Sequence, residues 1–354
     1  MKKALRYILA IVALALPCTF AAAQDAAAEE GGDDDLNVTE LIFEHTGDAY
    51  EWHLTNWGST SVSIPLPVIV RSKVSGWHCF SARHLRDGAT YEGFSIAPEG
   101  EKYEGKVVET VDGQILRPFD ISITKTVLAL IINSILLLVI ILTAASWYRR
   151  HDVRNEAPKG LAALLEPVIV MIEDEVIRPS VGEDYARYSP YLLTAFFFIL
   201  INNLMGIVPF FPGGGNVTGN IAVTVCLAVF TFLAVNLFGN RHYWKDILWP
   251  DVPIFLKAFP LMPVIEIIGM FTKPFSLAIR LFANIFAGHA MILGMVCVIF
   301  VTAKMGLAIN GSLTVVSVLL GVFMDCLEIL VAFIQAYVFT MLSSVFIGMS
   351  RQKE

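Results

Sequence analysis

The chain has 354 residues, of which 56% are hydrophobic and 16% are charged, and its mean hydropathy is +0.65. These values exclude an ordinary soluble globular protein and favour a protein that crosses a membrane several times. The formal net charge of -7 comes largely from an acidic segment at residues 29–35 and the region after it, so it does not indicate nucleic-acid binding.

The N-terminal segment, residues 1–23, has the three parts of a secretory signal peptide. Its basic, apolar and small-residue parts are Met1 to Arg6, Tyr7 to Leu16 and Ala21 to Ala23. The alternative is an uncleaved anchor helix, although the apolar part is short for a membrane span. We expect cleavage near Gln24, followed by an acidic linker at residues 24–35 that cannot bury enough apolar surface to fold.

Residues 36–120 differ from the rest of the chain in their pattern. Apolar and polar residues alternate in short stretches such as Val62 to Ile64 and Lys106 to Val111, and turn signals stand at Asp87–Gly88 and Asp112–Gly113. Alternation with period two is typical of half-buried strands, and Asp-Gly pairs are typical of turns. We therefore predict a small β-rich extension on the periplasmic side of the membrane.

Neither the histidines nor the cysteines have the spacing of a metal site. The histidines of the β-rich region are His45, His53, His78 and His84, and their spacing matches no metal motif. The five cysteines have no CxxC spacing, so they indicate neither a disulfide framework nor a zinc site. We expect no metal and no bound cofactor.

The first membrane span is predicted from Thr126 to Trp147, 22 residues without a charge. It is followed by Tyr148 and by the basic residues Arg149 and Arg150. An aromatic belt followed by a basic cluster marks the cytoplasmic end of a span. The signal peptide independently places the preceding region outside the cytoplasm, so the two inferences agree on the orientation.

Three further apolar segments follow. Lys159 to Arg178 is interrupted by acidic residues and a proline, and we predict an amphipathic segment at the membrane interface. Tyr191 to Phe211 and Gly219 to Gly239 are each 21 residues without a charge and are predicted to span the membrane. The loop between them lacks Lys and Arg and suits the periplasm, whereas residues 240–257 contain three basic residues and suit the cytoplasm.

Two long apolar segments complete a membrane domain at residues 121–354. They run from about Ala258 to Ala303 and from Met305 to Met349, longer than the roughly 20 residues of a perpendicular span, so we expect strong tilt. The predicted fold is an all-α polytopic membrane protein with five transmembrane helices, an amphipathic interfacial segment and a small β-rich extension. The C-terminus is predicted to be cytoplasmic.

Polar residues follow one face of the first long segment. Glu266, Lys273 and Arg280 are seven residues apart, a spacing that drifts only about 20° per step, and Asn284 lies one turn beyond Arg280. An arginine within lipid costs roughly 3 kcal/mol on insertion scales. Arg280 therefore indicates either an ion pair between helices or a functional site.

The last segment carries Glu328 and Gln335 on one face, with Asp325 about 60° away. If the two long helices pack antiparallel, positions whose numbers add up to nearly the same value lie at equal depth. That rule pairs Arg280 with Gln335 and His289 with Glu328. A hydrogen bond between helices would explain either polar residue of the last helix alone, but not the joint register.

One detail of this register has two interpretations. Nine residues place His289 about 180° from Arg280 on a straight helix. Either Gly288 permits a local change of helical path, or Arg280 faces a partner while His289 faces an internal water path. We favour the second interpretation.

The stretch Lys273 to Asn284, KPFSLAIRLFAN, followed by Ala287-Gly288-His289, closely resembles the signature helix of subunit a of F-type ATP synthases. The resemblance runs from about Thr126 to Ser350. It implies a non-catalytic stator subunit in the bacterial inner membrane that conducts protons through two half-channels to and from carboxylates of the c ring. It also implies the c-subunit ring, the b subunits and the remaining ATP synthase subunits as partners.

The resemblance further implies roles for individual residues. Arg280 is similar to the essential arginine that faces the rotating ring, with Asn284 as its neighbour and Gln335 as its partner from the last helix. His289 and Glu328 resemble the acid and base of the periplasmic half-channel.

Three more positions take their roles from the same resemblance. Glu266 is similar to a carboxylate on the cytoplasmic exit side, and Asn203 to a polar position of the third helix. Gly206 stands where some relatives carry an aspartate, so no aspartate relay is available there. We expect Asp325 to be the substitute.

The chemistry of arginine and of carboxyl groups is consistent with the role that the resemblance implies for Arg280. A ring carboxyl must be neutral to move through lipid and ionised to exchange its proton, and a nearby fixed cation favours the ionised form. An arginine keeps its own proton, so Arg280 would separate the two half-channels without passing the proton on.

Two other classes of protein were considered. A secondary transporter predicts repeated halves with broken helices, and the sequence contains no internal repeat. A purely structural anchor would not need Arg280, His289, Asp325 and Glu328 within lipid. The sequence has no Walker-type phosphate loop, so ATP chemistry is expected on other chains.

Overall fold

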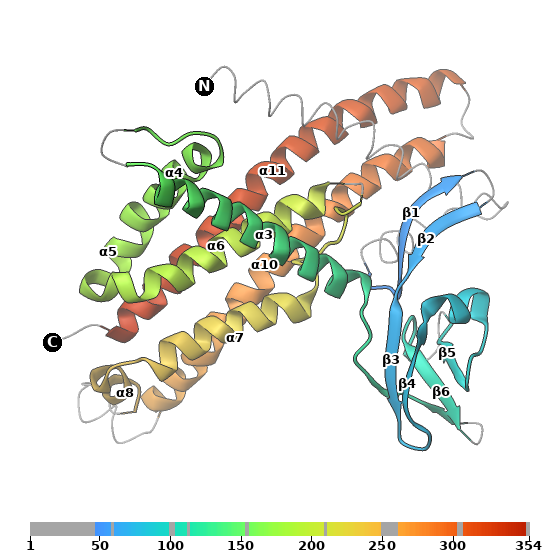
Figure 1. Ribbon diagram of the computed structural model, residues 1–354, viewed down its shortest axis with the longest axis horizontal. Coiled ribbons are helices and arrows are strands. Elements are labelled where there is room, and N and C mark those ends of the chain that lie inside the picture. Colours follow the sequence, from blue (N-terminus) through green and yellow to red (C-terminus); the bar gives the residue numbers. More distant parts are fainter. Residues whose placement is uncertain are drawn as a thin grey trace. The chain divides into compact units, whose positions relative to one another are not determined.

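The computed structural model describes residues 47–57, 60–98, 103–111, 114–152, 156–208, 211–248, 261–302 and 307–351 (Figure 1). The predicted signal peptide and acidic linker, and His45, lie outside these residues. Two compact units are present. Unit 1 comprises residues 1–132, 208–215 and 293–318, and unit 2 comprises residues 133–207, 216–292 and 319–354.

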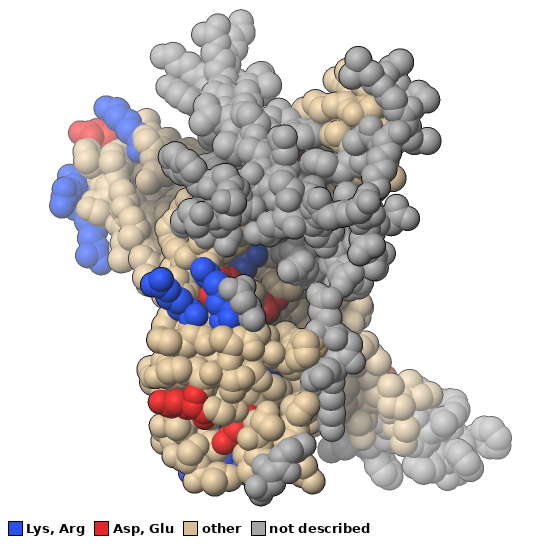
Figure 2. Space-filling view, turned by 90° about the vertical axis from the view of Figure 1, so that its right-hand side faces the viewer, with Lys and Arg blue, Asp and Glu red and all other residues tan. Residues whose placement is uncertain are grey.

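The membrane part consists of helices. They are α3 (Lys125–Arg150), α4 (Leu161–Met171), α5 (Arg178–Val181), α6 (Tyr185–Ile207), α7 (Ile221–Leu237), α8 (Arg241–Leu248), α10 (Leu261–Val301) and α11 (Leu307–Arg351). Among the described residues, four helical stretches are long and apolar enough to cross a membrane, and α7 is a shorter apolar helix. These helices confirm the predicted polytopic α-helical class. Figure 2 shows charged side chains in separate groups on a mostly uncharged described surface.

The bounds of helices α6 and α7 differ from those of the uncharged runs that predict them. Helix α6 ends at Ile207, four residues before the predicted Phe211. Helix α7 begins at Ile221 because the Asn220 side chain caps it by accepting a hydrogen bond from the Ala222 backbone N–H at 3.0 Å. Hydropathy locates apolar runs, whereas caps decide where a helix starts, so α7 has 17 residues instead of 21.

The predicted interfacial segment forms a continuous helical path into α6. Between α4 and α5 the helix widens into a π-helix, η2 (Ile172–Ile177), and a 3-10 turn, η3 (Gly182–Asp184), precedes α6. Ile172, Val176 and Ile177 are buried, whereas Asp174 and Glu175 are exposed. The segment is thus amphipathic, and its position at the membrane interface stays a prediction.

The core of unit 2 is formed by apolar faces of α6, α10 and α11 together with the π-helix. Its buried members include Leu192, Phe196, Ile199, Leu277, Leu281, Ile285, Ala336, Phe339 and Ile347. Within α10 and α6 these residues recur at three- and four-residue spacing, which places them on one side of each helix. Because these apolar faces pack into the core, the direction in which each polar residue of the same helices projects is fixed as well.

The C-terminal end of α11 is held by two kinds of contact. A side-chain carbon at Gly348 would lie 1.9 Å from the Ser180 carbonyl oxygen, so only glycine allows this approach. Arg351 forms an ion pair with Asp184 at 2.6 Å and donates hydrogen bonds to the Phe238 carbonyl and to Asn240 Oδ1 at 3.0 Å. The end of α11 is therefore joined to the start of α6 and the turn after α7.

The extension before α3 is β-rich, as predicted. Its strands are β1 (Glu51–Trp57), β2 (Thr60–Pro65), β3 (Pro67–Ser72), β4 (Gly76–Ser81), β5 (Phe94–Ile96), β6 (Val107–Val111), β7 (Gln114–Leu116) and β8 (Phe119–Asp120). They form three antiparallel sheets with the orders β1-β2, β4-β3-β8 and β5-β6-β7. The predicted alternating stretches lie in β2 and β6.

A small core lies between the β4-β3-β8 sheet, the β5-β6-β7 sheet and the 3-10 helix η1 (Ala82–Gly88). Val68, Val70, Phe80, Leu85 and Phe94 are buried in it. Of the two predicted turns, Gly88 ends η1 with a φ of +74°, a conformation that favours glycine, whereas residues 112–113 lie outside the described residues.

Two histidines of the extension, His78 and His84, have side-chain or backbone partners. His78 contacts Glu92 Oε2 at 2.6 Å and Ser75 Oγ at 2.8 Å. His84 Nδ1 contacts the Ser81 carbonyl oxygen at 3.2 Å. These contacts hold loops of the extension together.

Candidate functional site

His289 of α10 and Glu328 of α11 are in contact in unit 2. The His289 Nδ1 atom lies 2.8 Å from Glu328 Oε1, and the side chains are only 16% and 5% exposed. The two atoms are close but not aligned as a hydrogen bond, so within the described chain both Glu328 oxygens are buried without a hydrogen-bond partner. Buried carboxyl oxygens without partners are costly unless a proton, a cation or water satisfies them.

Two glycines make room for this pair. A side-chain carbon at Gly288 would lie 3.0 Å from Glu328 Oε1, tighter than an ordinary contact. A side-chain carbon at Gly206 of α6 would lie 3.5 Å from His289 Nε2. Gly206 therefore lies beside the imidazole, where an added carbon would be in ordinary contact with it. Three helices contribute to the site.

Asp325 lies one turn before Glu328 on α11. It is largely buried, and its Oδ1 atom has no hydrogen-bond partner in the described residues. It is close enough to Glu328 and His289 to interact with their charges. The structure thus gathers the predicted acids of α11 beside the histidine of α10.

Arg280 and Asn284 lie on the opposite side of α10 from this group. Both are exposed, while Leu277, Leu281 and Ile285 face the core. Helix α10 is continuous through Gly288. The opposite directions of Arg280 and His289 therefore follow from nine residues of regular helix, as in the interpretation we favoured.

The expected pairing of Arg280 with Gln335 is not formed. Within the described part of the chain, Arg280 has neither an ion pair nor a hydrogen bond, and Gln335 is 7% exposed. Equal depth in an antiparallel register does not require that two side chains meet, because Arg280 extends outward from α10. An exposed guanidinium on an apolar helix is costly in lipid unless an acceptor satisfies it.

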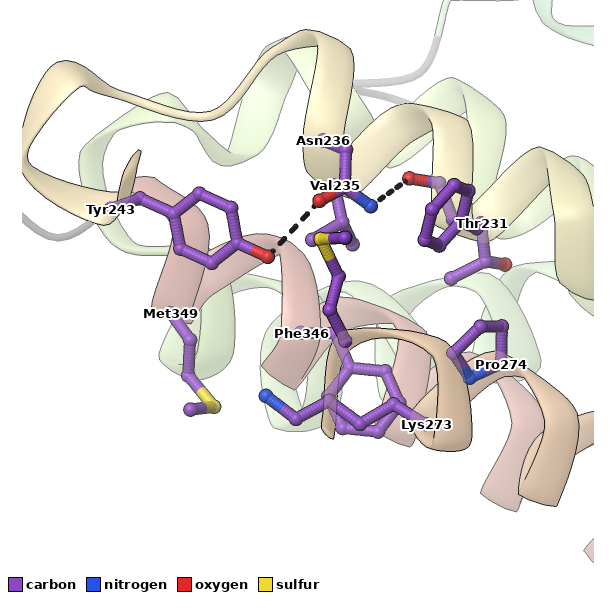
Figure 3. Close-up of a pocket in the computed structure, with 10 residues that line it drawn as sticks. Thr231, Val235, Asn236, Tyr243, Lys273, Pro274, Phe346 and Met349 are labelled. Carbon is purple, nitrogen blue, oxygen red and sulfur yellow. Dashed lines mark hydrogen bonds between the residues drawn. The ribbon is translucent and has the colours of Figure 1, made fainter. Parts of the chain in front are cut away.

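A second polar group lies on the N-terminal side of Arg280 along α10. A pocket of about 20 Å³ lies between α7, α8, α10 and α11 and is lined by Thr231, Asn236, Tyr243, Lys273, Phe346 and others. Figure 3 shows its lining side chains. A pocket of this size has room for about one water molecule. The Tyr243 hydroxyl donates to Asn236 Oδ1 at 3.2 Å, and Lys273 Nζ lies 5.7 Å from the centre of the Phe346 ring.

Glu266 lies two turns before Lys273 and is exposed. Burial and the charge of Glu266 raise the pKa of the Tyr243 hydroxyl above its usual value. Glu266 and Tyr243 are therefore electrostatically connected, and Tyr243 and Lys273 line the same pocket. Sequence reasoning missed Tyr243 and Asn236, because no pattern within α7 or α8 shows that they meet α10.

Asn203 of α6 is buried and fully engaged. Its Nδ2 donates to the Ala332 carbonyl of α11 at 3.2 Å, and its Oδ1 accepts from Thr218 Oγ1 at 2.6 Å. Another buried amide pair, Asn133 Nδ2 to Asn202 Oδ1 at 3.0 Å, connects α3 to α6. These bonds join α6 to α11, to the segment before α7 and to α3. Thr218, Asn133 and Asn202 were not predicted, although polar residues within apolar runs are a signal for such bonds.

The geometry separates two groups of polar side chains along α10. His289 is nine residues after Arg280, about 13 Å along a helix axis, and Lys273 is seven before it, about 10 Å. The group around His289 contains acids and an imidazole that can bind and release protons. The group around Lys273 contains a water-sized pocket. The exposed Arg280 stands between them.

Comparison with known proteins places these helices in a family. The family model described as ATP synthase A chain matches residues 130–348. A protein named ATP synthase subunit a 2 from Chlorobaculum tepidum is 40% identical over 75% of this chain and 71% of its own length. ATP synthase subunit a from Chloroherpeton thalassium is 41% identical over 66% of this chain and 67% of its own length.

A third bacterium carries a similar protein. ATP synthase subunit a from Anaeromyxobacter dehalogenans is 38% identical over 75% of this chain and 68% of its own length. A separate family model, a domain of unknown function, matches residues 41–121. This match covers the β-rich extension, and its description gives the extension no function.

Proposed function

The chain belongs to the ATP synthase A chain family, and from this premise we propose how its helices carry protons as the stator subunit of the Fo sector. Protons enter through the group around His289 and Glu328, reach a carboxyl of the c ring beside Arg280, and leave through the group around Lys273 and Glu266. The observation that carries this proposal is the buried contact of 2.8 Å between His289 and Glu328.

The uptake path uses groups that exchange protons. An imidazole binds and releases a proton near neutral pH, and a buried carboxyl next to it can accept or donate that proton. Both Glu328 oxygens and one Asp325 oxygen lack hydrogen-bond partners in the described chain, which suits transient partners such as water or a moving proton. Asp325 supplies a second acid where Gly206 provides none.

Arg280 is assigned as the residue that keeps the two paths apart. Its guanidinium retains its proton, so it holds a fixed positive charge opposite the ring carboxyl and favours the ionised form of that group. Across 100 mV each proton supplies about 2.3 kcal/mol, which a leak past Arg280 would lose without rotation. The exposed position of Arg280, with no partner in the described residues, supports a partner on another chain.

The release path is assigned to the polar group before Arg280. Glu266 is exposed, Tyr243 interacts with its charge, and the pocket beside Lys273 has room for about one water. Asn236 and Thr231 add hydrogen-bonding groups to the same pocket. Asn284 and Gln335 are assigned to the surroundings of Arg280 on α10 and α11.

The proposed partners are the c ring, the b subunits and the other ATP synthase subunits, which would carry the ATP chemistry. We expect the tagged chain, purified from its own membranes in mild detergent, to bring down a ring-forming proteolipid and a nucleotide-binding head. Mass spectrometry of the purified complex identifies them. Recovery of the chain alone, with ATP hydrolysis left in other fractions, would contradict the proposal.

The proposed orientation places the β-rich extension in the periplasm and both Arg150 and the C-terminus in the cytoplasm. Thr90 is an exposed residue of the extension. In the Thr90→Cys variant, a membrane-impermeant maleimide should label residue 90 in intact spheroplasts as fast as in opened membranes. Labelling that requires opened membranes would reverse the orientation.

A further inference from the structure

One face of the β4-β3-β8 sheet is apolar and exposed. Its inner face packs Val68, Val70 and Phe80 into the small core. Its outer face carries large side chains that are far from buried, with Trp77, Phe119 and Ile121 at 56%, 65% and 52% exposure. We call this the outer face, defined by Ile69, Arg71, Trp77, Cys79, Phe119 and Ile121.

The outer face is ordered by the strand register. Arg71 of β3 is directly opposite Trp77 of β4 on one side and Phe119 of β8 on the other. Residues directly opposite one another in antiparallel strands project to the same side of the sheet. The Arg71 guanidinium carbon lies 5.6 Å from the centre of the Trp77 ring, a cation–π contact. Two aromatic rings thus flank one arginine.

The second row of the outer face leads directly to the first membrane helix. Ile69 is opposite Cys79, and the Ile121 N–H donates to the Ile69 carbonyl at 2.9 Å. The Ile123 N–H donates to the Pro67 carbonyl at 3.2 Å, so the chain follows the edge of β3. Helix α3 begins two residues later, at Lys125.

The junction between the sheet and α3 is fixed by hydrogen bonds within unit 1. The Lys125 N–H donates to the Ala49 carbonyl at 2.8 Å, and the Thr126 N–H donates to Asp48 Oδ1 at 3.0 Å. These bonds hold the start of α3 to the residues that precede β1. In the first turns of α3, Val127 and Ile131 are exposed apolar residues.

The charge of the outer face matches a lipid headgroup layer. Arg71 is its charged residue, and no acidic side chain belongs to it among the described residues, while Lys73 and Arg117 are exposed beside it. Asp120, the acid of β8, is instead hydrogen-bonded to the Tyr50 hydroxyl at 2.5 Å. Aromatic rings with nearby arginine and lysine are the composition of membrane interfaces, and cations there are attracted to anionic lipids.

We propose that the outer face docks on the bilayer beside the start of α3, with Trp77, Phe119 and Ile121 in the headgroup region and Arg71 on lipid phosphate. The β-rich extension then acts as a membrane-bound brace that fixes the direction in which α3 enters the bilayer. This proposal requires that α3 spans the membrane and is independent of the proton path.

The first test measures the depth of Trp77 in the whole reconstituted complex. The difference in tryptophan emission between the wild type and Trp77→Phe isolates Trp77, and phenylalanine keeps the face apolar. We expect lipids brominated near the headgroup end of the acyl chain to remove most of this difference signal, and aqueous iodide to leave it nearly unchanged. Anionic phosphatidylglycerol vesicles should increase the quenching, and Arg71→Gln should abolish that increase.

A matched control moves the reporter to the other side of the small core. Arg83 is exposed on η1, whose Ala82 and Leu85 pack against the inner face of the sheet. With Trp77→Phe in place, a tryptophan introduced by Arg83→Trp should respond to iodide and not to brominated lipid. Trp77 quenched by iodide alone would show a free surface, and Trp77 reached by neither quencher would show a protein partner. Either result would overturn the proposal.

The second test uses the native thiol of Cys79. We expect a water-soluble maleimide to label Cys79 several times more slowly than the thiol of the Thr90→Cys variant. Phe119→Asp places a charge on the outer face and should bring the two rates close together. Equal rates without Phe119→Asp would contradict docking, and peptide mass spectrometry resolves the two sites.

Discussion

Replacing Arg280 by alanine should abolish ATP-driven proton pumping while ATP hydrolysis by the soluble head continues. Arg280 is a permanent charge that is exposed on α10 and has no partner in the described residues, so its removal leaves the packing of Leu277 and Leu281 unchanged. Without the fixed cation, the ring carboxyl is not held ionised at the boundary between the paths. Pumping is measured by dye quenching in inverted vesicles, and hydrolysis by phosphate release.

Two further variants sharpen this experiment. Arg280→Lys keeps the charge as a compact ammonium without the planar fork, so we expect partial pumping at most. Asn284→Ala changes an exposed neighbour one turn away and should retain more pumping than either. Normal pumping by Arg280→Ala in complexes that contain the full subunit set would remove Arg280 from the boundary between the two paths.

The sequence was most informative where one dominant property decides the structure. Long uncharged runs predict helices because backbone groups within lipid must be hydrogen-bonded internally. Strict spacing on α10 and α11 predicted the contact between His289 and Glu328, because two long helices joined by a short connection pack antiparallel over many turns. Alternation and turn residues predicted the β-rich extension.

Contacts that depend on side-chain direction could not be predicted in the same way. Arg280 and Gln335 share a depth but do not bond, because depth fixes one coordinate and the rotation of each helix fixes another. The meeting of Gly206 with His289 and of Tyr243 with Asn236 joins helices whose relative positions no local pattern specifies. The sheet order, which places Trp77, Arg71 and Phe119 in one row, likewise depends on pairing between distant strands.

The continuity of the two long helices also argues against a secondary transporter, the alternative class of protein. A secondary transporter of the broken-helix type binds its substrate at interrupted helices near the middle of the membrane. Helices α10 and α11 are uninterrupted over 41 and 45 residues, and the polar side chains project from regular helix. A fixed helical surface facing a moving ring suits a stator better than an alternating-access site.

His289→Ala and Glu328→Ala should each slow proton translocation by about a hundredfold, the lower end of what a positioned acid or base contributes to proton transfer. In the proposed path the two groups, which are in contact at 2.8 Å, pass the same proton, so loss of either should interrupt transfer. Glu328→Gln is the matched variant, because it keeps the shape of the side chain but cannot release a proton. A path for protons predicts that Glu328→Gln is nearly as slow as Glu328→Ala.

Exchanging His289 and Glu328 distinguishes most sharply between a role in proton transport and a role in helix packing. His289→Glu combined with Glu328→His keeps one acid and one imidazole at the two positions that are in contact. We expect this double variant to recover a substantial part of the rate that each single exchange loses. If the pair only packs α10 against α11, the single variants should instead lower the amount of assembled complex, measured on native gels, and leave the rate per complex unchanged. Variants that assemble fully and pump at the wild-type rate across the pH range in which imidazole titrates would exclude both residues from the proton path.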